Sequence, residues 1–448
     1  MSPASFHVRL LNLWPALAVA AATGSAPSSA PSPEIEALLT EVQRAGVRYF
    51  YDYGHPVSGL ARESTFHGDD VCTIGATGMG CFNLIVASER GFIPRRQVAE
   101  RLRRMLRFLS GRAERFHGAF PHWLNGRTGK VIPFSPDDDG ADLVETAFLA
   151  QGLLAVREYF TADDPVEVEV RGLADRLWRD IEWDFFVKTD GPDVYLLWHW
   201  SPRVGWKKNH AIRGFNECQI VYLLALASPV HAAPAEAYWR GWHGPDFSRP
   251  REHFGVRVSL GGRLEMPLFF THYSYLGLDP RAVAFDGRSY FEHFQGLCRV
   301  QIRYAQSRRG TFRGYGPLWG LTASLGPDGY RAFAPGADDD GTIAPTAALS
   351  SMPYVPQESR AFLLELHRNH RERLWGRFGY VDAFNLSRDW ATKEYLGIDV
   401  GPIGPMIENH RSGLCWKTFM KAPEIVAVVE RIRRAGPAGQ PSKPNAGR

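Results

Sequence analysis

The sequence has few cysteines and none of the short motifs that mark the common enzyme classes. Only five of its 448 residues are cysteine, and none forms a CxxC pair, which argues against a disulfide scaffold or a cysteine-based zinc site. The GxSxG, HExxH and Walker signatures are also missing, and the histidines show no metal-ligand spacing. We therefore expect no metal and no cofactor.

The charge balance is close to neutral for a chain of this length. The formal net charge is +4, with 22% charged residues. A dedicated nucleic-acid-binding protein usually carries a much larger basic excess, so we expect no nucleic-acid partner. A neutral substrate is compatible with this composition.

Long apolar runs are also missing, apart from a short one close to the N-terminus. Arg9 precedes an apolar stretch at residues 10–22, and small residues follow up to Ala26. This pattern is typical of a secretory signal, and the run is too short to span a bilayer comfortably. We predict a signal peptide at 1–26, a Ser/Pro linker at 27–33 and a disordered tail at 436–448. The mature protein would then be periplasmic or secreted from a bacterium, without stable membrane insertion.

Aromatic residues, in contrast, are abundant. The chain has 13 Trp, 16 Tyr and 27 Phe, and several Trp stand beside polar residues, as in His122-Trp123 and Trp198-His199-Trp200. Trp and Tyr rings can stack on the apolar faces of sugars, but large aromatics also simply fill a large core. For His122, His199 and His272, substrate contact and a buried core position are equally open.

Helical periodicity runs through the rest of the chain. Buried, apolar helices alternate with amphipathic ones, which is the pattern of an inner and an outer ring of helices. The sequence therefore predicts an all-α toroid, formed as one domain over 34–435, with short β-hairpins in its loops. The predicted helices are 34–51, 73–89, 95–111, 142–160, 166–183, 216–228, 290–307, 342–351, 358–374 and 423–434. The predicted hairpins are centred on 125–129 and 189–192.

An acidic stretch stands directly before one of the apolar helices. Residues 137–145 contain five carboxylates, and Asp142 and Glu145 share a face of the predicted helix because they are three apart. Paired carboxylates beside an apolar scaffold are what glycoside hydrolysis requires. The alternative is an acidic N-cap with first-turn charges that complement the helix dipole. For Asp137 and Asp139 we prefer this alternative.

Two further acidic positions are separated from this stretch by long segments. Glu217 stands at the head of an apolar run, where a charge is costly unless it is paired or faces a cavity. Asp399 lies between glycines and a proline, in a loop with defined backbone geometry. Glu408 follows nearby, and it is three residues from Arg411, with which it can pair.

Several long strings resemble the glycoamylase-like family that includes bacterial endo-β-1,2-glucanases (glycoside hydrolase family 144). The resemblance extends from about residue 35 to 434. The strings are Thr77-Gly78-Met79-Gly80, Asp142-Leu143-Val144-Glu145-Thr146-Ala147, Gly214-Phe215-Asn216-Glu217, Trp319-Gly320-Leu321-Thr322-Ala323-Ser324, Asp340-Gly341-Thr342-Ile343-Ala344-Pro345-Thr346-Ala347 and Ile407-Glu408-Asn409.

The resemblance implies an (α/α)6 barrel that acts on β-1,2-linked glucans (sophorooligosaccharides) without a cofactor. It also implies that the acidic stretch, Glu217 and Asp399 line the cleft. The candidate catalytic residues are Glu217, Asp399, Glu145 and Asp142. The candidate substrate contacts are Asp138, His122, Trp123, Trp200, Asn216, His272, Trp319, Glu408 and Asn409.

For the mechanism we predict Glu217 as general acid and Asp399 as base, which implies inversion, with carboxyl groups roughly 6.5–9.5 Å apart. Pairing Glu145 with Glu217 at roughly 5–5.5 Å would instead imply retention. We predict endo action on an oligo- or polysaccharide β-glucan. The alternatives are exo action, transglycosylation and a non-catalytic periplasmic glycan-binding protein.

Overall fold

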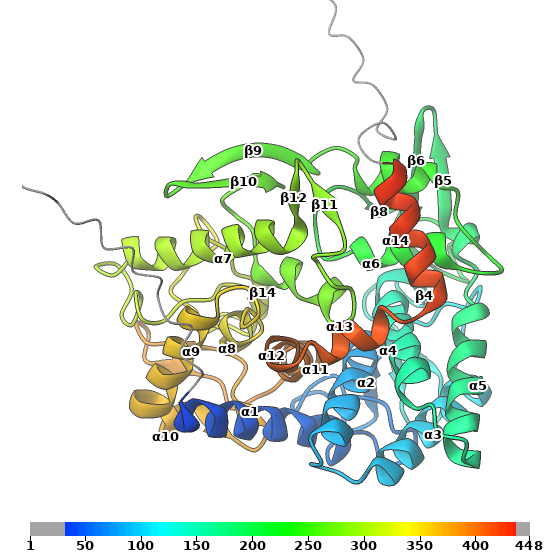
Figure 1. Ribbon diagram of the computed structural model, residues 1–448, viewed down its shortest axis with the longest axis horizontal. Coiled ribbons are helices and arrows are strands. Elements are labelled where there is room, and N and C mark those ends of the chain that lie inside the picture. Colours follow the sequence, from blue (N-terminus) through cyan, green and yellow to red (C-terminus); the bar gives the residue numbers. More distant parts are fainter. Residues whose placement is uncertain (1–31, 436–448) are drawn as a thin grey trace, which may run out of the picture.

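The computed structural model describes residues 32–435, and helices dominate it. Helices that are buried on almost every side alternate along the chain with amphipathic helices that cover them. In Figure 1, α3 and α5 lie at the edge of the molecule, with α2 and α4 inside them. The prediction of an all-α (α/α)6 barrel with short hairpins in its loops is confirmed. The predicted signal peptide and tail lie outside the described residues, as does the linker up to residue 31, and they stay predictions.

The helices have the following bounds. The inner helices are α2 (Ile74–Glu89), α4 (Leu143–Tyr159), α6 (Gln219–Ala227), α8 (Pro345–Leu349), α11 (Gly397–Val400) and α12 (Ile403–Arg411), and the outer ones are α1 (Pro33–Tyr51), α3 (Arg95–Gly111), α5 (Pro165–Arg179), α7 (Tyr290–Ser307), α9 (Pro356–Glu365), α10 (Arg371–Leu374), α13 (Leu414–Phe419) and α14 (Pro423–Ala435). Single 3-10 and π turns are η1 (Trp183–Phe186), η2 (Tyr238–Trp242), η3 (Leu268–Thr271), η4 (Tyr273–Tyr275) and η5 (Leu366–His370). No helix within residues 32–435 is long and apolar enough to cross a membrane.

The strands are short, and every pair of them is antiparallel. They are β1 (Val71–Thr73), β2 (Trp123–Asn125), β3 (Val131–Ile132), β4 (Ala141–Asp142), β5 (Val187–Asp190), β6 (Asp193–Leu197), β7 (His199–Trp200), β8 (Ala211–Ile212), β9 (Ser248–His253), β10 (Val256–Leu260), β11 (Ala284–Phe285), β12 (Arg288–Ser289), β13 (Ala323–Ser324), β14 (Arg331–Ala332), β15 (Trp375–Gly376), β16 (Gly379–Tyr380), β17 (Phe384–Asn385) and β18 (Trp390–Ala391). Both predicted hairpins are present, as β2–β3 and β5–β6. Each gains a third strand, β1 and β8 respectively, that the sequence did not reveal.

Most of the predicted helices are found with nearly the same ends, but the region after residue 400 differs. The sequence predicts a loop around Asp399, at 397–402, and no helix between 374 and 423, whereas residues 397–400 form α11 and the following residues form α12 and α13. Pro402 and Pro405 argue against a helix when helix propensity alone is considered. In the structure, Pro402 is the N-cap of α12 and Pro405 lies in its first turn. Proline is tolerated at both positions because first-turn N–H groups have no partner within the helix.

Two glycines set how closely α2 and α4 approach each other. A Cβ atom on Gly78 would lie 2.1 Å from the carbonyl oxygen of Phe148, and one on Gly152 would lie 2.4 Å from that of Gly78. Any larger residue would therefore push the two backbones apart. Gly78 thus serves the packing of α2 against α4.

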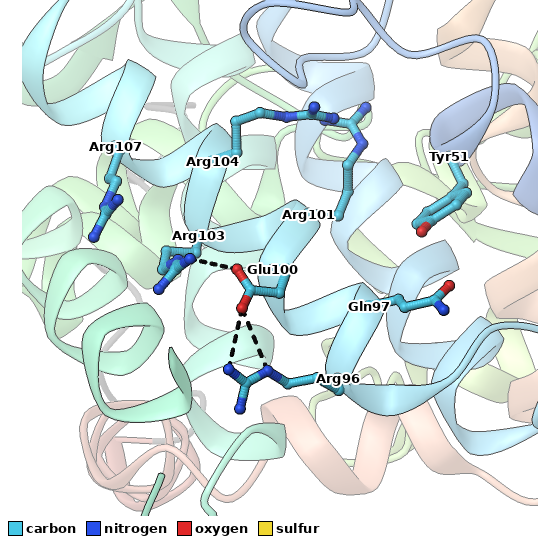
Figure 2. A pocket seen from close by; sticks show the side chains of 8 residues that line it. All are labelled: Tyr51, Arg96, Gln97, Glu100, Arg101, Arg103, Arg104 and Arg107. Carbon is cyan, nitrogen blue, oxygen red and sulfur yellow. Dashed lines mark hydrogen bonds and ion pairs between the residues drawn. The ribbon is translucent and has the colours of Figure 1, made fainter. Parts of the chain in front are cut away.

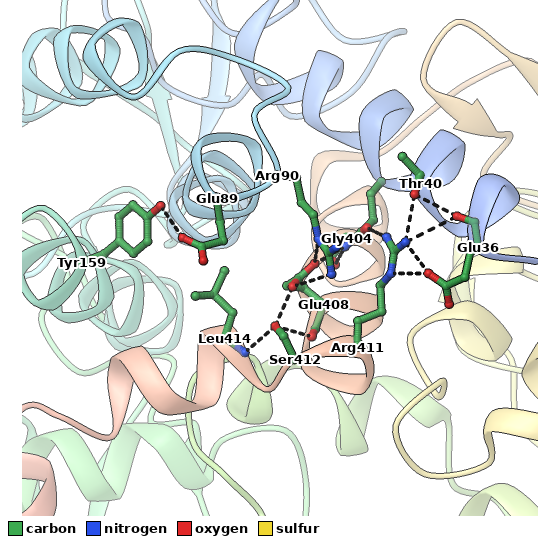
Figure 3. A network of polar contacts seen from close by, with 11 residues as sticks. Glu36, Thr40, Glu89, Arg90, Tyr159, Gly404, Glu408, Arg411, Ser412 and Leu414 are labelled. Carbon is green, nitrogen blue, oxygen red and sulfur yellow. Dashed lines mark hydrogen bonds and ion pairs between the residues drawn. The ribbon is translucent and has the colours of Figure 1, made fainter. Parts of the chain in front are cut away.

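A buried polar network ties α12 to α1 and α2 (Figure 3). The Glu408 carboxylate accepts two hydrogen bonds from Arg90, at 2.7 and 2.9 Å, and others from Gln43 and Ser412. Glu408 is 1% exposed. Burial would raise its pKa, but these donors outweigh burial and lower it. The expected pairing of Glu408 with Arg411 is wrong, because Arg411 binds Glu36 instead.

Replacing Glu408 with Gln should lower the free energy of unfolding by about 3 kcal/mol, because Arg90 loses its partner in a buried pair. Since the pKa of Glu408 is lowered in the folded state, this deficit should be present above about pH 4.5 and shrink as the pH falls below that value. Urea unfolding at several pH values measures it. Glu430→Gln, in an exposed pair, should change the stability by less than about 0.5 kcal/mol. Equal stabilities of both variants at pH 7 would contradict the assignment.

Candidate active site

A cavity of about 590 Å³ lies among the loops at the ends of the inner helices. Its lining comes from segments far apart in the chain, and it combines three carboxylates with many aromatic rings. The lining residues are Glu63, Phe66, His67, Thr73, His122, Trp123, Phe134, Val144, Glu145, Phe148, Trp198, Glu217, Phe269, Tyr273, Ala323, Leu325, Gly329, Tyr330, Leu396 and Ile398. Glu217, Glu145, His122 and Trp123 are the sequence-predicted site residues among them.

Glu217 lies in the loop directly before α6. The Asn216 side chain accepts a hydrogen bond from the Cys218 N–H at 2.9 Å, and the Ser274 hydroxyl donates to the backbone oxygen of Glu217. These contacts fix the backbone and leave the carboxyl group facing the cavity. Burial raises the pKa of Glu217 to about 7, despite the opposing effect of hydrogen bonds from its own N–H and from Cys218. A substantial fraction of Glu217 is therefore protonated at neutral pH, as a proton donor requires.

Glu145 lies in the first turn of α4, and its carboxylate reaches across to the start of α2. It accepts hydrogen bonds from the Gly75 N–H at 2.6 Å and from the Thr73 hydroxyl at 3.0 Å. Burial raises the pKa of Glu145; the charge of His122 opposes this effect and that of Asp142 adds to it. Glu145 is thus held rigidly in the cavity wall.

Asp142 caps α4, and it also holds His122. Its Oδ1 accepts from the N–H groups of Val144 and Glu145, at 3.0 and 2.9 Å, while its Oδ2 lies 3.0 Å from His122 Nδ1. Burial disfavours a charge on His122, but Glu145, Asp142 and Asp138 outweigh it and raise the pKa of His122 to about 9. His122 is therefore an imidazolium at neutral pH. Both interpretations of Asp142 hold together, since it is a helix cap and also part of the site.

Asp138 is a neighbour of Asp142 that lies farther from the cavity. Its Oδ2 is 3.1 Å from Lys208 Nζ and 3.5 Å from His199 Nε2. The neighbouring acids Asp137 and Asp139 pair with Arg203 at the surface, as expected for ordinary loop carboxylates. Asp138 thus acts on the cavity through His122 and His199 and does not line it.

Asp399 is buried beneath the cavity floor. The hydroxyl group of Tyr273, a lining residue, donates to Asp399 Oδ1 at 3.2 Å. Burial raises the pKa of Asp399 well above its usual value, and the adjacent Asp382 raises it further. Asp399 therefore contacts the cavity through Tyr273, next to its neighbours Leu396 and Ile398 in the wall.

Aromatic rings form the rim of the cavity. Trp123 packs edge-on against Phe134, with ring centroids 4.9 Å apart, and His67 lies on its other side at 5.2 Å. Phe66, Phe134 and Tyr330 remain 47%, 45% and 53% exposed. Large exposed aromatics gathered at one opening are typical of a binding surface and uncommon elsewhere.

The other predicted substrate contacts are not brought to the cavity. Trp319 and His272 are buried, and burial lowers the pKa of His272 to about 3, as in a core histidine. The Asn409 amide is occupied by Leu276 and Trp416, and Glu408 by the network of Figure 3. Trp200 packs against His117 and Phe185, and Asn216 serves as the turn cap described above. We assign these six residues no direct substrate contact.

The polar residues at the site that the sequence did not single out include Glu63, Tyr273, Tyr330 and Asp382. Tyr273 is adjacent to the predicted His272, and the 3-10 turns η3 and η4 direct the tyrosine to the cavity instead. Asp382 carried a usable signal, because an acid within Val381-Asp382-Ala383 is as unusual as Glu217 in its apolar run. Glu63 and Tyr330 lie in polar loops without any distinguishing pattern.

A second hollow, of about 660 Å³, lies on the outer face of α3 (Figure 2). It is lined by arginines, and its one carboxylate, Glu100, is paired with Arg96 and Arg103. It offers neither free acids nor clustered aromatics. Within residues 32–435 no group of His, Cys, Asp or Glu is arranged to hold a metal ion. The three carboxylates that line the central cavity support acid–base chemistry there.

Comparison with known proteins adds independent findings. Residues 209–423 match the family model described as "Glycoamylase: Putative glucoamylase". The endo-β-1,2-glucanase from Chitinophaga pinensis, solved with sophorotriose and glucose, is 41% identical with a TM-score of 0.85; the match covers 89% of this chain and 97% of that one. The fold is therefore shared over nearly the whole of that protein.

Two relatives from Parabacteroides distasonis are longer. One is a solved β-1,2-glucanase, 38% identical with a TM-score of 0.86, and the match covers 89% of this chain and 60% of that one. The other is an exo β-1,2-glucooligosaccharide sophorohydrolase (non-reducing end), 39% identical over 420 residues, which are 89% of this chain and 58% of the relative. Identity at this level over almost all of the C. pinensis structure shows common descent, and the chain belongs to the glycoamylase-like family of glycosidases.

Proposed function

We propose that the protein hydrolyses β-1,2-linked glucans and sophorooligosaccharides. The observation that carries this proposal is Glu217, a carboxyl group whose pKa is raised to about 7 and which lines an aromatic-rimmed cavity together with Glu145. The relatives named for β-1,2-glucan cleavage support the substrate class. Exposed rings at the rim suit the stacking of glucose units.

In the proposed reaction Glu217 donates its proton to the glycosidic oxygen as the bond to the leaving sugar breaks. Water attacks the anomeric carbon from the opposite face, and Asp399 receives a proton through the Tyr273 hydroxyl group, which passes its own proton to Asp399 and takes that of the water. In its ionised form Asp399 is a stronger base than an ordinary aspartate, because burial raises its pKa. After product release, Glu217 regains a proton and Asp399 loses one, so the enzyme returns to its first state.

The Glu145–His122–Asp142 cluster supplies electrostatic positioning. Its two carboxylates flank one imidazolium, so its charge is close to that of a single anion. An anionic cluster in a water-poor cavity stabilises the positive charge that develops on the sugar ring in the transition state. Glu145 would also bind substrate hydroxyl groups, while Asp142 fixes the orientation of His122.

We further propose that the enzyme is endo-acting and inverting. The endo mode is supported by the match to the C. pinensis endo-β-1,2-glucanase over 97% of that chain. Inversion is the outcome expected when Glu217 acts as acid and Asp399 as a base that activates water, because no covalent glycosyl-enzyme forms.

Purified protein should release sophorooligosaccharides of mixed length from linear β-1,2-glucan, and little or no product from β-1,3-glucan. The measurement is a reducing-end assay combined with chromatography of early products. Sophorose alone at early times would show exo action, and larger or cyclic products would show transglycosylation. Binding without turnover would contradict the proposed function.

Glu217→Gln should lower kcat on linear β-1,2-glucan by at least about 100-fold, because the leaving oxygen loses its acid. Wild-type kcat/KM should fall as the pH rises through about 7, where Glu217 loses its proton. An aryl sophoroside with a good leaving group should restore much of the lost rate. Glu265→Gln, an exposed control, should behave like the wild type. Full activity of the Glu217 variant would exclude it as the acid.

The first product anomer should be α, inverted from the β linkage, since water attacks directly. Proton NMR of the anomeric region, recorded within the first minutes before mutarotation, distinguishes the two outcomes. An initial β anomer would show retention and would favour Glu145 as nucleophile.

A further inference from the structure

Asp382 is a buried acid that the mechanism above does not use. It follows β16 and is 5% exposed. Its Oδ2 accepts a hydrogen bond from the Leu325 N–H at 2.8 Å, but its Oδ1 is buried and has no donor among the described residues. A buried carboxylate oxygen without a donor is costly, so this atom needs an explanation.

Asp399 shows the same imbalance. Its Oδ1 accepts from the Tyr273 hydroxyl group, while its Oδ2 is buried and lacks a donor among the described residues. The side chains of Asp382 and Asp399 lie within hydrogen-bonding distance of each other. The unsatisfied oxygens therefore belong to two adjacent acids, and a proton held between the two acids supplies the missing donor.

The surroundings disfavour two negative charges at this place. Burial raises the pKa of Asp382 to about 7, although the Leu325 N–H and Asp399 oppose this effect. The charge of Glu63 raises the pKa of both aspartates, and Tyr273 and Tyr330 face them with neutral hydroxyl groups. Two like charges in contact within a low-dielectric site do not both ionise near neutral pH.

We propose that Asp382 is a positioning residue that shares one proton with Asp399, so that the two acids act together as a single base. The proposal rests on the proposed function, because it assigns Asp399 the role of base. The shared proton holds the Asp399 carboxyl group in one orientation. It also leaves the pair with one negative charge, which is the form that can accept a proton.

The protons transferred in this step balance. Before the reaction the pair carries one proton and one negative charge. Attacking water gives its hydroxide to the anomeric carbon and its proton to the Tyr273 hydroxyl group, which passes its own proton to Asp399, and the pair becomes neutral. Glu217 gives its proton to the leaving oxygen. The pair then releases one proton to solvent, and Glu217 takes one up.

A purely structural role for Asp382 is the competing interpretation, since its bond to Leu325 anchors the segment that carries Gly329 and Tyr330 at the cavity. Asp382→Asn separates the two roles. The asparagine oxygen can still accept from Leu325, but the side chain can no longer share a titrating proton. Asp339→Asn is a matched control, because the pKa of Asp339 is also raised by burial but the residue lies outside the cavity.

The test compares the kcat/KM profiles of the wild type and both variants on linear β-1,2-glucan. In Asp382→Asn the acidic limb should move to higher pH by about one unit, because the Asp399 carboxylate loses the shared proton that stabilises its negative charge, and kcat should fall on the order of 10-fold because the carboxylate loses its fixed orientation. KM should change little. Asp339→Asn should leave the profile unmoved. An unchanged acidic limb in Asp382→Asn would overturn the proposal.

Infrared difference spectroscopy reads the proton without relying on turnover. In a Glu217→Gln background, the chain with Asp382 intact should show a protonated-carboxyl band near neutral pH that disappears on Asp382→Asn substitution. Absence of the band from the chain with intact Asp382 would overturn the proposal, and this result would hold even if the Asp382→Asn variant failed to fold. If the band is present but the wild-type protein does not cleave β-1,2-glucan, the shared proton is retained and the proposed function is rejected instead.

Discussion

The site depends on the close packing of α2 against α4. Gly78 and Gly152 let the two backbones touch, and at the end of the same interface Gly75 has no side chain to hold Glu145 away. The Gly75 N–H can therefore donate to Glu145 at 2.6 Å. Because α4 also begins at Asp142, this one interface sets the position of Glu145, Asp142 and His122 together. Larger residues at these glycines would displace Glu145 and, with the start of α4, the pair of Asp142 and His122.

The buried acids of this protein fall into two groups, which differ in the direction of their pKa shifts. Glu408 is surrounded by donors, and its pKa is lowered. Glu217 and Asp399 have few donors, and burial raises their pKa values. The first arrangement stabilises a charge and joins α12 to its neighbours, whereas the second keeps protons available at neutral pH. The same residue types thus serve stability or chemistry according to how many donors the surrounding backbone supplies.

Residue patterns allowed much of the fold to be predicted. Apolar and amphipathic helices alternate, and the ends of 95–111 and 290–307 were found as predicted. The helix after Pro402 was missed, because prolines in a first turn look like a break. Glu217 was identifiable, since an acid at the head of an apolar run calls for a special environment. Trp319, His272 and Asn409 have equally suggestive neighbours, yet they pack into the scaffold.

The sequence by itself determined which segments are buried helices and that unusual acids stand at their ends, because hydrophobic periodicity and local charge are properties of neighbouring residues. Only the tertiary structure decided which acids meet. Asp382 and Asp399, Glu145 and Gly75, and Tyr273 and Asp399 come together across long stretches of chain. Their pKa values follow from burial and from partners that no local pattern encodes, so the division of roles among the carboxylates belongs to the fold.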